Sequence, residues 1–536
     1  MQSRPGARSH MSVRLTVWDG ADVIGGNKIL LETEEARVFF DFGTTFAARE
    51  RYFEEYLKPR STRGLLDLAS LGLLPPLLGL YREDLLLGGL GGACCQRLRR
   101  QPGCREIGPV DGVFLSHAHI DHSGYISFLR PDIPVYSTAM TAAIAKAMQD
   151  SSISDFEKEV CYLTPRQQSQ EGTVESTDWR RVPHQGRQFY TLDGPPPPEV
   201  CQFWSSCCGG RRLEACDLTE APARIGALPA RTFPVDHSIY GASACAVQTE
   251  LGWVVYTGDL RLHGQRGSLT QEFARQVASL QPYLLICEGT HVGDGRVTSE
   301  EEVHERCLKA VREAEGLVVA DFGPRNVERL LIFRQIAERT GRRLAILAKD
   351  AYLLEAMRSA DPTVPTVGVD GFLRIYRDVK AKLQTWESSL LERYRPCCVD
   401  AAEVQRHQSE YILCLSFWDV NELVDVEPQP GSVYIYSSSE AYSEEQKIDR
   451  VRLLNWIDRF QMDLVGIDRS QEDLPNADGY HASGHITGPE LLSLIGEIRP
   501  RALVPVHTQK PEFFTENLRA VCLVIVPERG QEIALG

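Results

Sequence analysis

Four side chains that can bind metal ions lie within one short segment of this chain. The segment Ser-His-Ala-His-Ile-Asp-His supplies His117, His119, Asp121 and His122. Imidazole and carboxylate groups together suit zinc or a similar first-row divalent ion. Only 13 histidines occur in 536 residues, so chance clustering is a poor explanation. The spacing predicts that two histidines share one ion while Asp121 and His122 reach a second, and two close metal ions form a hydrolytic centre.

Later in the chain, three more candidate ligands each follow an apolar run that predicts a strand. These are His237, Asp259 and His507. We expect one ion to be held by His117, His119 and His237 and the other by Asp121, His122 and His507, with Asp259 bridging the pair. A bridging carboxylate reduces the repulsion between two cations, and water held between them loses a proton near neutral pH. Asp41 either orients a ligand imidazole from behind or is a turn residue before Gly43.

The spacing of apolar residues predicts the strands and helices that must position these residues. The run 112–115 predicts a buried strand directly before the histidine cluster, and 13–17, 28–33 and 36–42 predict earlier strands. Residues 46–105 are expected to be largely helical and to form a cap. Residues 165–230 are rich in Pro, Gly and Gln and predict a long irregular insertion. From about residue 298, helical stretches alternate with short strands, which indicates an α/β unit with a parallel sheet.

The composition restricts the class of protein. With 43% hydrophobic and 24% charged residues the chain is typical of soluble globular proteins. No apolar stretch is long enough to span a bilayer, and the polar leader 1–11 is unlike a signal peptide. The net charge of −15 argues against a broad basic surface for nucleic acid. It does not exclude a nuclease, because bound divalent ions supply local positive charge.

Cysteine usage indicates the compartment. The chain has 15 cysteines, an odd number, without an export signal, which predicts reduced thiols and a cytoplasmic location. Four of them, Cys201, Cys207, Cys208 and Cys216, lie close together in sequence. We interpret them as free thiols of a surface insertion, with a structural zinc site as the alternative.

The combined motifs resemble a known family. HAHIDH, His237 in PVDHSIYGASA and Asp259 in YTGDLR resemble the metallo-β-lactamase fold. Glu288 in CEGTH, His485 in HASGH and His507 in VPVHT resemble motifs A, B and C of its β-CASP nuclease branch, and ribonuclease J in particular. The resemblance implies an α/β fold class, an αββα sandwich with an inserted β-CASP α/β domain. The implied parts are a disordered leader at 1–11, a metallo-β-lactamase domain at 12–294 with the irregular insertion at 165–230, the β-CASP domain at 295–475, and a return segment at 476–536.

The resemblance also implies the chemistry. It predicts two Zn²⁺ per chain, with Mn²⁺ or Mg²⁺ as substitutes, and a single-stranded RNA running between the two domains. Asp121, Glu288 and His485 are the expected catalytic residues, with His485 protonating the departing 3′ oxygen with help from Glu288. His481, Ser483 and Gly484 are expected to bind a phosphate or the substrate. Histidine at position 507 resembles the RNA-acting members. The predicted activity is therefore RNA hydrolysis in processing or decay, as a 5′→3′ exonuclease, with endonuclease action as the alternative.

Some features depart from the family pattern. The chain ends soon after His507, so the additional C-terminal domain of many ribonuclease J proteins is expected to be missing, and dimerisation through it is not assumed. Residues 436–440 replace an expected Gly- and Gln-containing loop. Two other functions stay open: a small-molecule thioester or lactone hydrolase of the same fold, and an inactive RNA-processing scaffold. All seven candidate ligands are present, which argues against the scaffold.

Overall fold

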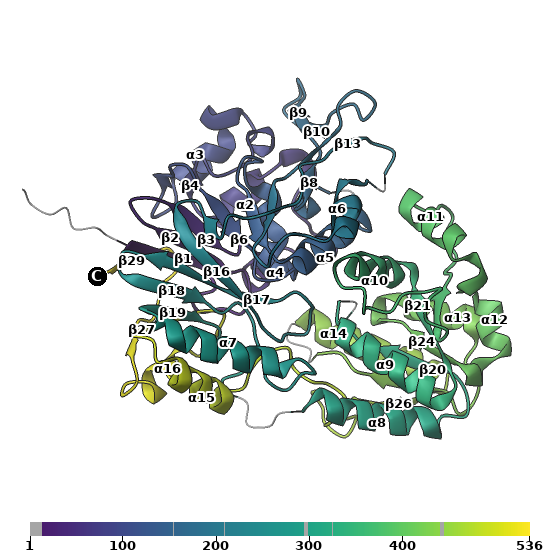
Figure 1. Ribbon diagram of the computed structural model, residues 1–536. Coiled ribbons are helices and arrows are strands. Elements are labelled where there is room, and N and C mark those ends of the chain that lie inside the picture. Colours follow the sequence, from purple (N-terminus) through teal and green to yellow (C-terminus); the bar gives the residue numbers. More distant parts are fainter. Residues whose placement is uncertain (1–12, 154, 208, 294–297, 324, 440–443) are drawn as a thin grey trace, which may run out of the picture.

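Two β-sheets lie face to face in the computed structural model and are covered on their outer sides by helices (Figure 1). The structure describes residues 13–536 except 154, 208, 294–297, 324 and 440–443, so the expected leader 1–11 lies outside the described residues. The first sheet has the strand order β14 (Thr219–Glu220), β12 (Phe189–Thr191), β7 (Val135–Ser137), β6 (Gly112–Phe114), β3 (Arg37–Phe40), β2 (Lys28–Glu32), β1 (Val13–Asp19) and β29 (Glu532–Leu535). The second has the order β15 (Arg224–Ile225), β16 (Leu228–Pro234), β17 (Ser243–Thr249), β18 (Gly252–Tyr256), β19 (Leu284–Cys287), β27 (Ala502–Pro505) and β28 (Leu523–Val524).

Side-chain alternation along the strands builds the layers. Ile29 and Leu31 of β2 enter the core between the two sheets, whereas Leu30 packs on the outer side of the first sheet. Val38 and Phe39 of β3 divide in the same way. Successive side chains point to opposite faces of the sheet, and both sets are buried here. Helices must therefore cover the outer face of each sheet. The result is the αββα sandwich expected from the motifs.

A third sheet interrupts the second one in sequence, between β19 and β27. Its order is β23 (Cys398–Val399), β22 (Leu373–Tyr376), β21 (Arg343–Leu347), β24 (Tyr411–Cys414), β20 (Val318–Asp321), β25 (Val433–Tyr436) and β26 (Asp463–Val465). All pairings in this sheet are parallel, as the alternation of helices and strands predicts. In Figure 1 this α/β unit lies beside the sandwich, with α10 against α5.

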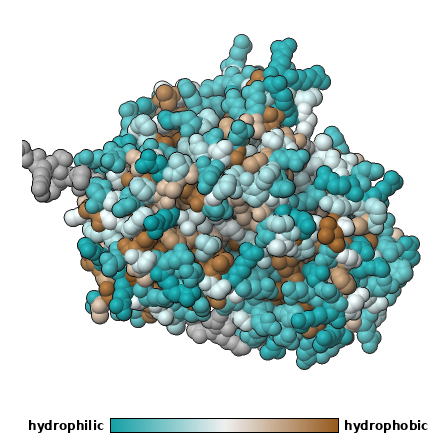
Figure 2. All heavy atoms as spheres, viewed as in Figure 1, coloured by the Kyte–Doolittle hydropathy of each residue, from teal (hydrophilic) through white to brown (hydrophobic). Residues whose placement is uncertain are grey.

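The helices have the following bounds. Around the sandwich lie α1 (Phe46–Glu50), α2 (Leu66–Ser70), α3 (Ala93–Arg99), α4 (Ile120–Ser123), α5 (Ala139–Asp150), α6 (Pro198–Ser205), α7 (Gly267–Leu280), α15 (Gly488–Ile498) and α16 (Pro511–Asn517). The inserted unit contains α8 (Glu300–Glu313), α9 (Val327–Thr340), α10 (Ala348–Ala360), α11 (Thr385–Arg393), α12 (Ala401–Arg406), α13 (Leu423–Val426) and α14 (Glu444–Arg459). Among the described residues, no helix is long and apolar enough to cross a membrane. On the face shown in Figure 2, hydrophobic residues are scattered among hydrophilic ones.

The expectation of a largely helical cap at 46–105 is wrong. Only α1, α2 and α3, short 3₁₀ turns and the two-residue strands β4 (Leu77–Leu78) and β5 (Arg105–Glu106) form there. Pro75 and Pro76 and the glycines at 88–92 interrupt the apolar run, because proline and glycine disfavour continued helix. The leucines of this region pack on the outer face of the first sheet instead.

The insertion at 165–230 is more ordered than its composition predicts. Strands β12 and β14 extend the edge of the first sheet, and α6 packs against that region. Short strands β8 (Tyr162–Leu163), β11 (His184–Gly186) and β13 (Leu213–Glu214) form a small sheet, and β9 (Arg166–Gln168) pairs with β10 (Val174–Ser176). These strands are too short for their periodicity to appear in the sequence. Cys201, Cys207 and Cys216 are free thiols and, within the described part of the chain, belong to no group with metal-ligand geometry; Cys208 lies outside it.

Candidate metal centre

The candidate ligands lie where strands of both sheets end. His117 follows β6, and Asp41 follows the neighbouring parallel strand β3. On the second sheet, Asp259 follows β18 and His507 follows β27, with β19 between them in parallel. The carboxyl ends of parallel strands meet at one edge of a sheet, so residues distant in sequence converge there.

Two of these positions have an unusual backbone. Asp41 and His507 have φ angles of 56° and 53°, in the left-handed region that residues other than glycine rarely adopt. Main-chain hydrogen bonds hold both: the Asp41 N–H donates to the Phe114 carbonyl at 2.8 Å, and the His507 N–H donates to the Gly20 carbonyl at 2.7 Å. Such strain persists where the surrounding structure over-determines it, as it does at functional sites.

Three histidine nitrogens converge in the first ligand group. His119 Nδ1 lies 3.0 Å from His117 Nε2 and 3.2 Å from His237 Nε2. Burial lowers the pKa of His117 and of His237 well below the ordinary value, and it lowers the pKa of His119 to about 4. All three are therefore neutral imidazoles at neutral pH, with lone pairs facing a common point. That is the donor set of a zinc-type site.

The second ligand group surrounds one oxygen of Asp259. Its Oδ2 atom lies 3.1 Å from His122 Nε2 and 3.7 Å from His507 Nε2. The same atom lies 3.7 Å from His117 Nε2 and 3.8 Å from His237 Nε2 in the first group. Asp121 Oδ2 completes the second group, 3.4 Å from His507 Nε2. Asp259 thus lies between the groups, the position expected of a bridging carboxylate.

Two buried atoms indicate that these groups fit a divalent cation. Among the described residues, His122 Nε2 and Asp259 Oδ1 are buried without a hydrogen-bond partner. Burial opposes charge on His122, but the surrounding carboxylates of Asp259, Asp121 and Asp41 outweigh it and raise its pKa well above the usual value. A buried carboxylate oxygen without a partner is costly, and a divalent cation bound here would displace the His122 proton and take up the freed Nε2 lone pair together with the carboxylates.

The nitrogens on the far side of the ligand rings are also bonded. Asp41 Oδ2 lies 2.7 Å from His122 Nδ1 and accepts hydrogen bonds from the Ser116 and Tyr256 hydroxyls, both at 2.7 Å. Asp41 therefore does both: it lies at the end of β3, and it accepts a hydrogen bond from the His122 imidazole. His237 Nδ1 lies 2.6 Å from the Gly484 carbonyl. These contacts fix the tautomer so that each Nε2 faces the ligand group.

His485 and Glu288 lie at the border of the same cluster. His485 Nδ1 is 2.9 Å from Glu288 Oε2 and 3.9 Å from Asp259 Oδ2. Burial would lower the pKa of His485, but Glu288 and Asp259 raise it to about 9. The Thr290 hydroxyl donates to Glu288 Oε2 at 2.9 Å and lies 2.8 Å from His507 Nδ1. Glu288 therefore acts on two histidines, on one directly and on the other through Thr290.

The three expected phosphate-binding residues occupy different surroundings. Gly484 packs so closely on His237 that an added Cβ would lie 2.9 Å from its Cε1. Ser483 Oγ accepts the His485 N–H at 3.1 Å, so it shapes the loop. His481 Nδ1 lies 3.4 Å from the Ser437 carbonyl, and His481 belongs to none of the ligand groups. The sequence did not identify Thr290, Tyr256 or Ser116 as contributors, because each also bonds a residue from a distant segment: His507, Asp41 and Asp41 respectively.

Three features together define the metallo-β-lactamase fold: the αββα sandwich, the candidate ligands at the strand ends, and the second sheet that is interrupted by an inserted unit. Residues 88–186 match the Beta-lactamase superfamily domain. The chain is similar to ribonuclease J of Sinorhizobium meliloti, with 24% identity over 74% of this chain and 57% of that protein. It is equally similar to ribonuclease J of Mycolicibacterium smegmatis, at 24% identity over 75% of this chain and 59% of that protein.

The chain thus spans less than two thirds of the length of these relatives. A solved structure, a protein of unknown function from Enterococcus faecalis V583, has 23% identity and a TM-score of 0.65, and the match covers 98% of this chain and 100% of that one. This likeness supports the fold. The chain therefore has the metallo-β-lactamase fold and is similar in sequence to ribonuclease J over about three quarters of its length.

Proposed function

We propose that this chain is a metal-dependent ribonuclease that hydrolyses RNA phosphodiester bonds, acting as a 5′→3′ exonuclease on single-stranded RNA. The observation that carries the proposal is the His485–Glu288 pair, 2.9 Å apart, beside an Asp259 oxygen shared by two ligand groups. An acid next to a two-metal centre suits hydrolysis with a poor leaving group such as an alkoxide. The similarity to ribonuclease J supports RNA as the substrate.

The ligand sets follow from the two groups. His117, His119 and His237 would hold one divalent cation and Asp121, His122 and His507 the other, with Asp259 bridging them. We propose zinc as the native ion, with manganese or magnesium as substitutes, because imidazole predominates among the donors. Bound ions would supply Lewis-acid activation of water and neutralise charge on the phosphate.

The chain's own residues account for the proton transfer. Glu288 accepts from His485 Nδ1, so His485 Nε2 carries the proton that can be given away. As a water oxygen bonds to phosphorus and the bond between phosphorus and the 3′ oxygen breaks, that proton moves to the 3′ oxygen, which leaves as a hydroxyl. The product on the other side keeps the phosphate. Glu288 stabilises the protonated ring before transfer and holds its orientation.

We also propose the division of the chain into a metallo-β-lactamase domain at 12–294 and 476–536 and a β-CASP domain at 295–475. RNA would bind between them, with His481, Ser483 and Gly484 on the substrate side. The abundance of free thiols supports a cytoplasmic site of action.

The test digests matched RNA and DNA oligonucleotides with 5′-monophosphate, 5′-triphosphate or 5′-hydroxyl ends. Wild type is expected to shorten the RNA from its 5′ end, and Asp121→Ala is the inactive control. Internal fragments would replace the exonuclease assignment with endonuclease action. Hydrolysis of a thioester without cleavage of any oligonucleotide would refute the nuclease and favour a small-ester hydrolase.

A further inference from the structure

Arg325 lies in the inserted unit beside the segment of the ligand groups and has no hydrogen-bond or ion-pair partner among the described residues. It precedes α9 and lines a cavity of about 530 Å³ whose other walls include Thr44, Ile120 and Ser123 of the sandwich. Ile120 and Ser123 belong to α4, the short helix that carries Asp121 and His122. Within the described part of the chain, no hydrogen bond or ion pair reaches the Arg325 guanidinium. Arg49, in the same cavity, is by contrast paired with Glu157 at 2.7 Å.

The cavity places Arg325 beside the segment that carries both ligand groups. It shares this cavity with Ile120, which lies between His119 of the first group and Asp121 of the second. Burial lowers the pKa of Arg325 to about 10, and the nearby Asp121 carboxylate acts against this fall.

A partly buried guanidinium without a counter-ion is unfavourable. Cations bound by the ligand groups would repel Arg325 and increase this cost. An anion lying between Arg325 and the ligand groups would remove both penalties, because it would accept charge-assisted hydrogen bonds from the guanidinium and bind the metals on its other side.

We propose that Arg325 is the anion-binding residue of this centre and donates to a non-bridging oxygen of the phosphate at the cleavage site. This assignment rests on the proposed function and deepens it, since it names the residue that selects phosphodiesters. A neutral thioester or lactone offers no charge for Arg325, so the residue favours phosphodiester substrates over neutral esters.

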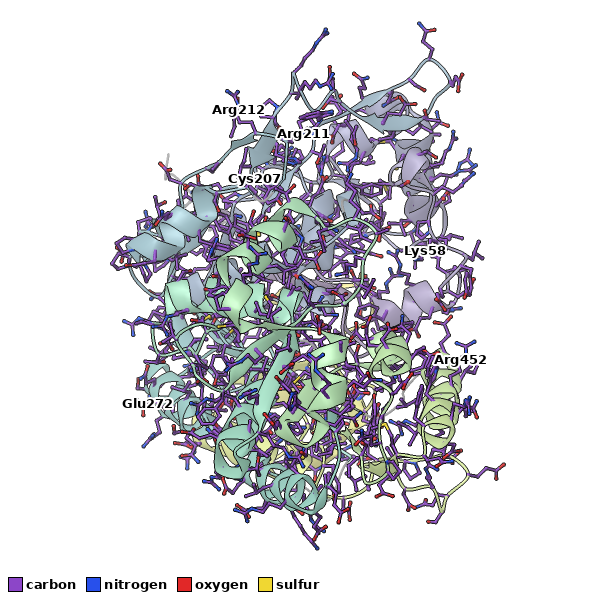
Figure 3. All side chains as sticks on the ribbon, turned by 90° about the vertical axis from the view of Figure 1, so that its right-hand side faces the viewer. Lys58, Cys207, Arg211, Arg212, Glu272 and Arg452 are labelled. Carbon is purple, nitrogen blue, oxygen red and sulfur yellow. The ribbon has the colours of Figure 1, made fainter. Side chains whose placement is uncertain are left out.

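The same cavity carries carboxylates, among them Glu50, Glu54 and Glu445, which restrict where a phosphate can lie, and it also offers aromatic side chains to a base. Phe46 and Trp418 line it with exposed fractions of 44% and 68%, and flat aromatic side chains can stack on bases whatever the sequence. Lys58, which projects from the loop after α1, lies on the same cavity (Figure 3). The sandwich and the inserted unit thus both contribute to one surface.

The test measures RNA binding separately from turnover. Wild type, Arg325→Gln, Arg325→Lys and Arg334→Gln, each with metal bound, are titrated into a 3′-fluorescein single-stranded RNA with a 5′-monophosphate, whose 2′-O-methyl riboses resist cleavage, at several salt concentrations. Arg334 is a matched control because it also belongs to the α9 region but pairs with Asp370 at 2.6 Å. Anisotropy gives Kd and its salt dependence.

Arg325→Gln is expected to raise Kd on the order of tenfold and to reduce the slope of log K against log salt by about one. Arg325→Lys should keep the slope and recover part of the affinity, since lysine keeps the charge but loses the planar fork. Arg334→Gln should match wild type. Equal Kd and slope for Arg325→Gln and wild type, or no binding by wild type, would overturn the assignment.

A second assay separates this proposal from the proposed function. With metal bound, Arg325→Gln should lower kcat/KM for bis(p-nitrophenyl) phosphate by about 10–100-fold, the usual effect of removing one charge-stabilising donor, at unchanged metal content. If wild type cleaves RNA but Arg325→Gln behaves like it in both assays, the nuclease stands and Arg325 is wrongly assigned. If wild type binds RNA through Arg325 but cleaves nothing, the anion site stands and the nuclease fails.

Discussion

At the scale of single residues, the candidate centre depends on the ring nitrogens that face away from the ligand groups. A ligand imidazole must hold its second nitrogen on an acceptor, since otherwise its ring can rotate and its tautomer is undefined. Asp41 accepts for His122, the Gly484 carbonyl for His237 and the Thr290 hydroxyl for His507. The acceptors come from three different parts of the chain, so each ligand is held by tertiary structure.

Asp41→Asn tests this dependence. The amide cannot accept from all the donors now bonded to the carboxylate, and it presents hydrogens to His122 Nδ1, so metal affinity should fall by about 10–100-fold. Competition with a chelator measures this affinity. Tyr256→Phe is the control: it removes one donor to Asp41 and keeps the buried ring, so its loss should be smaller. Unchanged affinity in Asp41→Asn would contradict the orienting role.

The pH dependence of activity should follow the acid form of His485. Because the raised pKa is about 9, the imidazole is protonated at neutral pH, and kcat should fall as the pH rises through this pKa. Glu288→Gln removes the neighbouring charge, so the pKa falls and the descending limb should move to lower pH. The readout is the pH profile of kcat on RNA. Profiles with the same descending limb would argue against the pair.

At the scale of elements, local patterns located most of what positions the site. The strands expected at 13–17, 28–33 and 36–42 are present as β1, β2 and β3, and the parallel alternation from residue 298 is confirmed. Thr290 could not be assigned, because a threonine two residues beyond Glu288 has no local signal for bonding His507. The strands β12 and β14 were missed because two- or three-residue strands form only where an existing sheet edge pairs with them.

A buried charge network that no local pattern predicts links the inserted unit to the loop of His485. Glu300, the first residue of α8, accepts from Arg261 at 3.1 Å and from Arg329 at 2.8 Å. Arg261 also donates to the Ser483 carbonyl at 3.0 Å, and Arg329 to the Tyr480 carbonyl at 3.2 Å. Glu300 thus joins the two arginines that hold the backbone before His485.

Glu300→Gln should lower the free energy of unfolding by about 3–5 kcal/mol, because it leaves the buried Arg329 without a carboxylate partner, whereas Arg261 keeps Asp236 and Glu328. Burial opposes ionisation, but Arg329 and Arg261 lower the pKa of Glu300, so its stabilisation is present at neutral pH and is lost as the pH falls through the acid range. Thermal and urea unfolding at pH 7 measure the change. Glu338→Gln, in an exposed pair on α9, should cost about 0–1 kcal/mol. Equal losses for the two variants would refute the network's contribution.

At the scale of the whole molecule, the sandwich is closed by residues from opposite ends of the described chain. β29 pairs antiparallel with β1, with Val13 opposite Leu535, and forms the edge of the first sheet. The second sheet also needs the late strands β27 and β28. Strands that follow the inserted unit in sequence therefore complete both sheets. The candidate ligands His117 and His507 come together through long-range pairing, which is slow to form.

Deleting residues 530–536 tests how far the sandwich depends on this closure. The deletion keeps every candidate ligand but removes β29, exposes the unpaired edge of β1 and uncovers core positions beside Leu535, which is 5% exposed. We expect a lower midpoint of thermal unfolding and concentration-dependent aggregation, measured by scanning calorimetry and light scattering. Glu532→Gln, which removes only the exposed pair with Arg14, should leave both unchanged. If the truncated chain unfolded like wild type and stayed monodisperse, β29 would be a dispensable edge, and the stability of the site would reside in the strands β1 to β28 alone.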